Sequence, residues 1–276
     1  MILLLYLILL SIKIPKNEII KLFLSFIFSY FFLLSYDNDG DLAVYFGNLS
    51  SINNIYNYKE IIFWGPLFAL KLFTSKSITI LITYTLINRL ILQVVEKYDF
   101  KSCAWVLAFL PFFVFGYNNI LRQFIAVLFL MSINKKYLTY LTFFIHNGVS
   151  ISFFDYLNKT MQWLLAVIIL ILSFVVPPQV RFMRESLNLS IVYFIVFLVL
   201  IFISKKLSLS SLWIKVILFV ALSNVFHFDF VERIYMMLFT IYFIKYFKTN
   251  KNIYSILSIL FFLISVFNNN YARFFF

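Results

Sequence analysis

The sequence predicts an all-α, polytopic membrane protein with about ten transmembrane helices and two re-entrant elements. Hydrophobic residues make up 63% of the chain and its mean hydropathy is +0.97, which leaves little polar sequence for a soluble domain. Apolar runs close to the length of a membrane span recur along the chain, and short Lys-rich loops separate them. We therefore expect residues 1–276 to form a single integral membrane domain.

The apolar runs define the expected spans in chain order. The first run resembles a signal peptide, but it lacks a basic start and a small-residue cleavage site, so we interpret it as a short first span. Several other runs are also short, which favours a thin or irregular transmembrane body. The expected spans are Met1–Ile12, Ile19–Ser35, Ser77–Val95, Ser102–Tyr117, Ile120–Ile133, Met161–Val176, Leu187–Ile203, Ser210–Phe226, Ile234–Phe247 and Ile253–Phe267.

Two further apolar stretches are interrupted. Gly65 and Pro66 break Ile61–Phe73, and His146-Asn147-Gly148 breaks Tyr137–Leu157. If the second stretch turns back rather than crossing, the Lys-rich loops that follow it all face the cytoplasm, as the positive-inside rule requires. Both stretches are therefore expected to be re-entrant, and a non-helical break at membrane depth is expected to line a wet cavity.

Lys and Arg are expected on opposite sides of the membrane. The Lys-rich loops face the cytoplasm and contain Lys13, Lys16, Lys21, Lys97, Lys101, Lys135, Lys136, Lys159, Lys205, Lys206, Lys245, Lys248 and Lys251. Four of the six arginines, Arg122, Arg181, Arg184 and Arg233, then fall on the opposite face. Topology does not account for positive charge there, and guanidinium groups suit phosphate or carboxylate ligands. We therefore expect an anionic ligand on that face, although Arg122 could instead snorkel to the interface and Arg181 and Arg184 could form a basic loop.

The one long polar segment, Tyr36–Glu60, is expected to be a loop on the side of the membrane opposite the Lys-rich loops. Its Asp37-Asn38-Asp39-Gly40-Asp41 start has oxygen ligands at alternate positions, but the glycine and the distal glutamate do not have EF-hand spacing. The acids could instead sit at a solvated helix end, or a carboxylate could hold a sugar hydroxyl or act as a base.

Two other polar groups interrupt apolar sequence. His146 lies mid-membrane in the expected topology, where it is either a satisfied structural residue or part of a site. His227, Asp229, Glu232 and Arg233 meet at one expected helix junction, either as a salt-bridged turn or as a base with a phosphate clamp.

Several function classes are excluded by what the sequence lacks. A single cysteine, Cys103, excludes an internal disulfide and a Cys-based metal site, and two histidines argue against a His-built metal site. No phosphate-cradling glycine loop, metalloprotease motif or nucleophile elbow is present, so neither a nucleotide nor a metal cofactor is expected. The net charge of +12 is interpreted as membrane topology with anionic lipid contacts rather than as nucleic-acid binding.

The order of motifs resembles that of a known family. An early acidic and Tyr-rich loop ends in an acid (Asp41, Tyr45, Glu60). It is followed by the motif Asn119-Ile120-Leu121-Arg122-Gln123-Phe124-Ile125-Ala126, by a Lys pair and by the motif Phe144-Ile145-His146-Asn147-Gly148. The last motif in the chain is Glu232-Arg233-x-Tyr235. Over residues 37–235 the chain resembles the O-antigen and capsule repeat-unit polymerases of the Wzy type and the related EpsG-like exopolysaccharide proteins. Asn147-Gly148 stands where those families usually have a small residue or Ser.

The resemblance implies a GT-C-like membrane glycosyltransferase of the bacterial inner membrane. It implies polymerisation, at the periplasmic face, of oligosaccharide repeat units carried on undecaprenyl diphosphate into O-antigen or capsular polysaccharide, with membrane lipids and a chain-length regulator as further partners. The residues support this interpretation, because arginines suit the diphosphate and acids or His suit a base or contacts to sugar hydroxyls. The rival interpretations are a flippase or transporter of lipid-linked oligosaccharide and a non-catalytic assembly subunit. The candidate diphosphate ligands are Arg122, Arg233, Arg181 and Arg184, and the candidate catalytic residues are His146, Asp41, Glu60 and Glu232.

Overall fold

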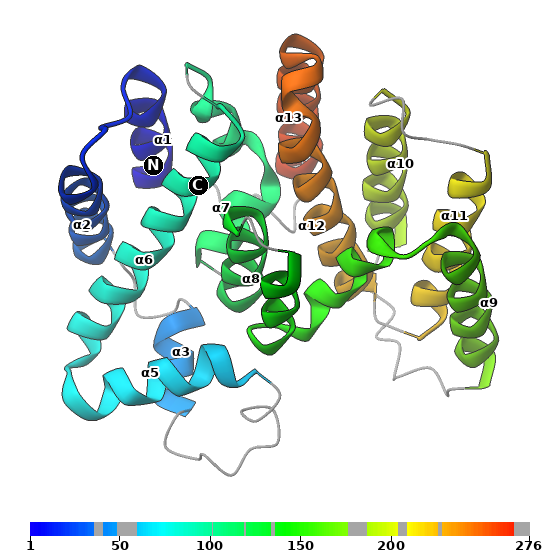
Figure 1. Ribbon diagram of the computed structural model, residues 1–276, viewed down its shortest axis with the longest axis horizontal. Helices are drawn as coiled ribbons and strands as arrows, with labels where there is room; N and C mark the ends of the chain where they lie inside the picture. Colours follow the sequence, from blue (N-terminus) through cyan, green and yellow to red (C-terminus); the bar gives the residue numbers. More distant parts are fainter. Residues whose placement is uncertain are drawn as a thin grey trace. The chain divides into compact units, whose positions relative to one another are not determined.

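The protein is all-α in the part of the chain that the computed structural model describes. That part comprises residues 1–35, 41–48, 60–100, 102–118, 120–133, 136–175, 187–203, 209–225 and 228–267. Every regular element within these ranges is an α-helix or a 3-10 helix, which confirms the all-α class (Figure 1). The chain forms two compact units, Met1–Val149 with the segment from Lys251, and Ser150–Asn250.

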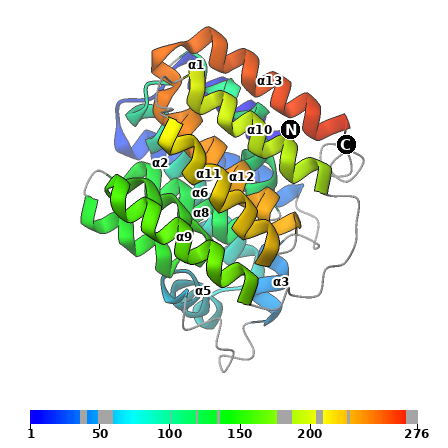
Figure 2. The same cartoon turned by 90° about the vertical axis from the view of Figure 1, so that its right-hand side faces the viewer.

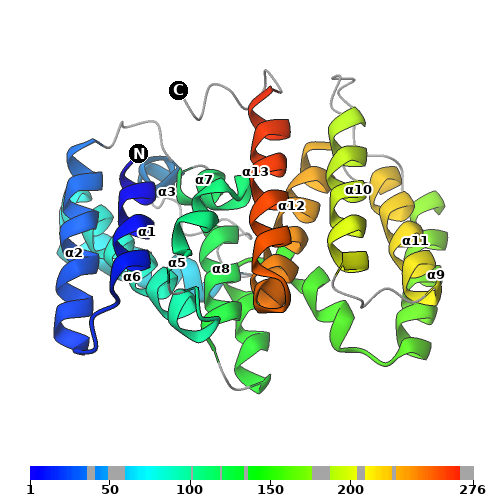
Figure 3. The same cartoon turned by 90° about the horizontal axis from the view of Figure 1, so that it is seen from above.

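The first unit is built around α6 (Lys76–Lys97). On one side α6 packs against α2 (Glu18–Leu34), which neighbours α1 (Ile2–Ile12), and on another side against α8 (Leu121–Ser132) (Figures 1 and 3). The remaining elements of this unit are α3 (Asp41–Asn48), α5 (Ile61–Phe73), η1 (Ala104–Phe109), α7 (Pro111–Asn118), η2 (Lys136–Phe144) and α13 (Lys251–Phe267), with η3 (Asn147–Tyr156) running from this unit into the next.

The second unit consists of paired helices. α9 (Lys159–Val175) packs against α11 (Leu209–Val225), and α10 (Leu187–Ile203) packs against α12 (Phe228–Tyr246), which is followed by η4 (Phe247–Thr249) (Figure 2). The α10–α12 contact is aromatic, because Phe194 and Phe197 lie against the buried ring of Tyr235.

Most expected span limits agree with observed helix limits to within a few residues, but two expectations are wrong. Ser102–Tyr117 is not one span: Leu110 is extended, so the segment divides into η1 and α7. The residue before a proline avoids the helical region, and Pro111 is suited to begin a new helix. Conversely, Ile61–Phe73 is unbroken, because Pro66 deprives α5 of only one backbone hydrogen bond.

The expected interruption of Tyr137–Leu157 is confirmed. Two 3-10 helices, η2 and η3, replace a single helix and meet at Ile145-His146. The segment expected as a loop at 36–60 contains a helix, α3. Within the described ranges, α6 alone is long and apolar enough to cross a bilayer, and seven shorter apolar helices accompany it; the expected ten spans stay a prediction.

α2 has a polar inner face and an apolar outer face. It buries Lys21, Ser25 and Ser29, whereas Phe23 and Phe31 are more than half exposed. Such a distribution is the reverse of that of a water-soluble helix, which places its apolar side chains inward.

Hydrogen bonds fill the polar interior beside α2. Asn88 of α6 donates to Ser29 Oγ at 2.9 Å and accepts from the Tyr117 hydroxyl at 2.9 Å, while its backbone carbonyl accepts from the Tyr6 hydroxyl at 2.8 Å. Tyr84 in turn donates to the backbone carbonyl of Tyr117 at 2.7 Å. This buried network joins α1, α2, α6 and α7.

Gly116 sets the approach of α7 to α8. A Cβ at this position would lie 2.4 Å from Phe124, closer than real Cβ contacts. Phe124 is fully buried one turn into α8, so the glycine lets α7 lie against the first turn of the helix that carries Arg122.

We expect Asn88→Ala to lower the free energy of unfolding by about 1–3 kcal/mol, because it leaves the Tyr117 hydroxyl buried without its acceptor. Reversible unfolding in mixed micelles measures this change. Thr85→Ala is the matched control on the same helix, because within the described residues Thr85 bonds only the Leu81 carbonyl of its own helix. Its effect should stay below about 0.5 kcal/mol. Equal effects of the two substitutions would contradict a stabilising role for the network.

Candidate functional site

Arg122 and Glu60 form an ion pair at the ends of two helices. Arg122 is the second residue of α8, and its Nη1 lies 2.5 Å from Oε2 of Glu60, the N-cap residue of α5. The Glu60 side chain is 8% exposed and the Arg122 side chain 25% exposed. A carboxylate this deeply buried requires a partner, and Arg122 provides one.

Aromatic rings surround the guanidinium group. The Arg122 Cζ lies 5.0 Å from the centre of the Tyr45 ring on α3 and 5.3 Å from that of the Trp64 ring on α5. The two rings contact each other edge to face at 5.3 Å. Cation–π contacts at these distances stabilise a guanidinium group. The side chains of α3, α5 and α8 therefore form one cluster around Arg122.

Two buried N–H groups in this cluster lack acceptors. Neither Nε of Arg122 nor Nε1 of Trp64 has a hydrogen-bond partner within the described part of the chain. An unsatisfied buried donor costs free energy comparable to that of a lost hydrogen bond, so such groups mark a place for an acceptor. The Nε–H of the guanidinium group itself and the indole N–H of Trp64 beside it suit a ligand with several anionic oxygens.

His146 approaches the other oxygen of Glu60. Its Nε2 lies 4.0 Å from Glu60 Oε1, and its Nδ1 accepts a hydrogen bond from the Gly148 backbone N–H at 2.9 Å. Because Nδ1 is the acceptor, a neutral His146 carries its proton on Nε2, directed toward the carboxylate. A side chain at position 148 would collide with the imidazole, since a Cβ there would lie 2.9 Å from it.

The arrangement pairs one acid with two positively polarised groups. Glu60 can accept a proton or a hydroxyl hydrogen bond, and Arg122 can hold an anion. His146 lies 4.0 Å from the second oxygen of Glu60, which is longer than a hydrogen bond. Within the described residues no cluster of three or more His, Cys, Asp or Glu side chains could hold a metal ion.

The structure brings together three of the eight candidate residues, namely Arg122, Glu60 and His146. Asp41 begins α3, the helix that carries Tyr45, but its side chain lies outside the described part. Arg181 and Arg184 also lie outside the described residues. Glu232 is buried and Arg233 exposed on α12, in the second unit, so their expected place beside Arg122 stays a prediction.

Trp64 is the site residue that the sequence did not reveal. It lies one helical turn after Glu60, so the two share a face of α5. The four-residue spacing from Glu60 could have indicated Trp64 as a neighbour of the acid. Aromatic residues make up 22% of the chain, however, so an aromatic residue at such a spacing is common.

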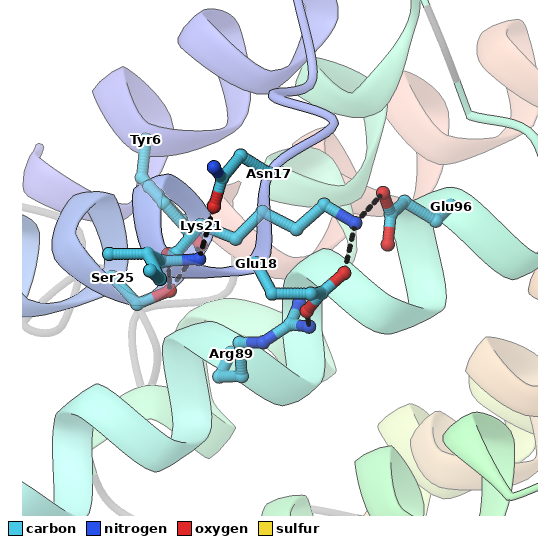
Figure 4. Close-up of polar contacts among 8 residues, drawn as sticks. Tyr6, Asn17, Glu18, Lys21, Ser25, Arg89 and Glu96 are labelled. Atoms are coloured by element: carbon cyan, nitrogen blue, oxygen red, sulfur yellow. Dashed lines mark hydrogen bonds and ion pairs between the residues drawn. The ribbon is translucent and has the colours of Figure 1, made fainter.

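A second charged cluster joins α2 and α6 and was also missed. Lys21 is expected in a cytoplasmic loop, but it lies on α2 and is buried. Its Nζ lies 2.8 Å from Glu18 and 2.7 Å from Glu96 (Figure 4). Arg89 bonds the other oxygen of Glu18. The hydrogen bond from Lys21, together with the Arg89 charge, holds the pKa of Glu18 below its ordinary value.

The comparisons with known proteins return no relative for this chain. No protein-family model matches it, and no curated protein and no solved structure is significantly similar to it.

We expect Arg122→Met to lower the free energy of unfolding by about 3 kcal/mol, because it leaves Glu60 buried without its cation. Adding Glu60→Gln should recover part of this loss, so the two effects are not additive. The matched control is Arg233→Met, which removes an exposed arginine from α12 and should change stability little. Strict additivity of the Arg122 and Glu60 substitutions would contradict the ion pair.

Proposed function

We propose that this protein is a membrane glycosyltransferase that polymerises lipid-diphosphate-linked oligosaccharide repeat units at the periplasmic face of a bacterial inner membrane. Its product would be O-antigen or capsular polysaccharide. The proposal rests on the resemblance to repeat-unit polymerases and on the chemistry of the Arg122 cluster.

The observation that carries the proposal is the meeting of Arg122, Glu60 and His146 from three distant parts of the sequence. A glycosyl transfer from a lipid diphosphate requires a cation for the leaving group and a base for the attacking hydroxyl. Arg122 supplies the first and Glu60 the second, and the Tyr45 and Trp64 rings hold the guanidinium group in place through cation–π contacts.

The proposed step is a single displacement. The acceptor hydroxyl attacks the anomeric carbon of the donor sugar, the bond from that carbon to the diphosphate oxygen breaks, and the diphosphate leaves with the electron pair. Glu60 takes the hydroxyl proton, and Arg122 stabilises the charge that develops on the leaving diphosphate. Before the ligand binds, the Glu60 carboxylate is paired with the Arg122 guanidinium group. An incoming diphosphate takes the place of the carboxylate on Arg122, so that Glu60 becomes available to the acceptor hydroxyl.

The surface of the first unit supports a membrane location. α2 presents large apolar side chains outward and polar ones inward, which suits hydrocarbon surroundings. The Lys-rich loops support an orientation with the Arg122 end of α8 on the periplasmic side.

The two rival functions predict different surface polysaccharides after deletion of the gene. Loss of a polymerase leaves single repeat units on the cell surface, whereas loss of a flippase leaves none, and loss of an assembly subunit alters chain length while polymer remains. Gel electrophoresis of surface polysaccharide separates the three outcomes, and the proposal requires the first.

We expect Arg122→Lys to reduce polymer to less than a tenth of the wild-type amount, because lysine keeps the charge but loses the paired donors that grip a diphosphate. The measurement is polymer abundance in the deletion strain complemented with each variant at equal protein level. Lys13→Gln, at an exposed lysine outside the cluster, is the control and should give wild-type polymer. Full-length polymer at wild-type abundance from Arg122→Lys would exclude Arg122 as a diphosphate ligand.

A further inference from the structure

An apolar groove lies between α5, α6 and α8. Its volume is about 380 Å³, and its walls include Leu67 and Leu70 of α5, Leu86 and Leu90 of α6, and Phe129 of α8. A groove of this size and lining fits part of a hydrocarbon chain. Because the α6 lining spans several helical turns, the groove follows the helix axis.

Arg89 lines this groove and has an unused donor. One of its terminal nitrogens, Nη2, bonds Glu18, whereas Nη1 is buried and has no hydrogen-bond partner within the described part of the chain. Gln93, one helical turn further along α6, lines the same wall and adds an amide. A charged donor and an amide beside an apolar groove match an amphiphile with an anionic head.

The ion pairs of α2 hold Arg89 in place. Lys21 fixes Glu18 from one side and is itself fixed by Glu96, so Glu18 presents its second oxygen to Arg89 (Figure 4). A guanidinium group held by one nitrogen is preorganised to bind an anion with the other.

The expected topology gives the depth of this cluster. Glu18 is the first residue of α2, its side chain is 66% exposed, and it follows the loop of Lys13 and Lys16 that the positive-inside rule places in the cytoplasm. The Arg89 guanidinium therefore reaches the headgroup level of the cytoplasmic leaflet, away from the periplasmic side proposed for Arg122. Phospholipid phosphates are the abundant anions at that level.

We propose that the groove is a binding site for a glycerophospholipid of the cytoplasmic leaflet, with its phosphate on Arg89 and Gln93 and one acyl chain along α6. The groove walls also include Ile62, two residues after Glu60, and Ile145, next to His146, so the far end of the groove approaches the Arg122 cluster. The proposal rests on the membrane orientation proposed above and not on the glycosyltransferase activity.

Native mass spectrometry of the full chain in detergent tests the site, with dioleoyl-phosphatidylglycerol and dioleoylglycerol as probes. The wild-type protein should retain the phospholipid and should bind dioleoylglycerol at least tenfold more weakly, because only the phospholipid carries the phosphate. Leu86→Trp, at an exposed groove position, should lower phospholipid affinity by filling the groove. Lys13→Gln, which removes an exposed charge from the same expected face, should leave the affinity unchanged.

Two further variants separate a binding site from a structural ion pair. Arg89→Gln should weaken phospholipid binding about tenfold, whereas Glu18→Gln should strengthen it, because the neutral amide competes less well for Arg89. A purely structural pair would make both variants lose affinity together. Any of three results would overturn the proposal. They are equal binding of the two probes, unchanged phospholipid affinity in Leu86→Trp, and losses of affinity of the same size in Arg89→Gln and Glu18→Gln.

Discussion

The ion pair between Arg122 and Glu60 determines the form of the candidate site. It fixes the first turn of α8 against the start of α5, and Tyr45, Trp64 and His146 take positions around it. Neither charge could be buried alone at an acceptable free energy, so the helices that carry them must meet. The close approach at Gly116 and the polar network around Asn88 then hold α8 and its neighbours in that position.

The same constraint explains the polar interior of the first unit. Lys21, Ser25, Ser29 and Asn88 are buried, and each forms hydrogen bonds or ion pairs with a neighbouring helix or its own backbone. In the membrane surroundings that we propose, apolar contact between helices gains little free energy, so polar pairs and close packing decide which helices associate. Each of the two ion pairs also leaves one buried donor that has no hydrogen-bond partner in the described part of the chain, Nε of Arg122 and Nη1 of Arg89. Both proposed ligand sites use such a donor.

Much of the helix plan could be predicted because each apolar run is a local property of the sequence. The limits of α9 and α10 follow directly from such runs. Breaks were harder to predict, because a proline acts through its neighbours: Pro66 lies within a helix that absorbs one lost hydrogen bond, whereas Pro111 imposes an extended residue before a new start.

The site was visible from sequence only where a residue was locally anomalous. Arg122 stands out as a charge inside an apolar run, and His146 as a polar residue at an interruption. The pairing of Glu18 with Arg89 joins positions 71 residues apart, and no local pattern encodes it. Trp64 was hidden by the abundance of aromatic residues, since its role comes from its distance to Arg122 rather than from its neighbours in sequence.

The proposed activity forms glycosidic bonds and releases a lipid diphosphate. It can be measured with the purified full chain in proteoliposomes, with a lipid-linked repeat unit as the only substrate. Polymerisation predicts a ladder of products and one free lipid diphosphate for each repeat unit joined. Repeat units that cross the bilayer unchanged, with no lipid diphosphate released, would contradict the proposal and identify a transporter.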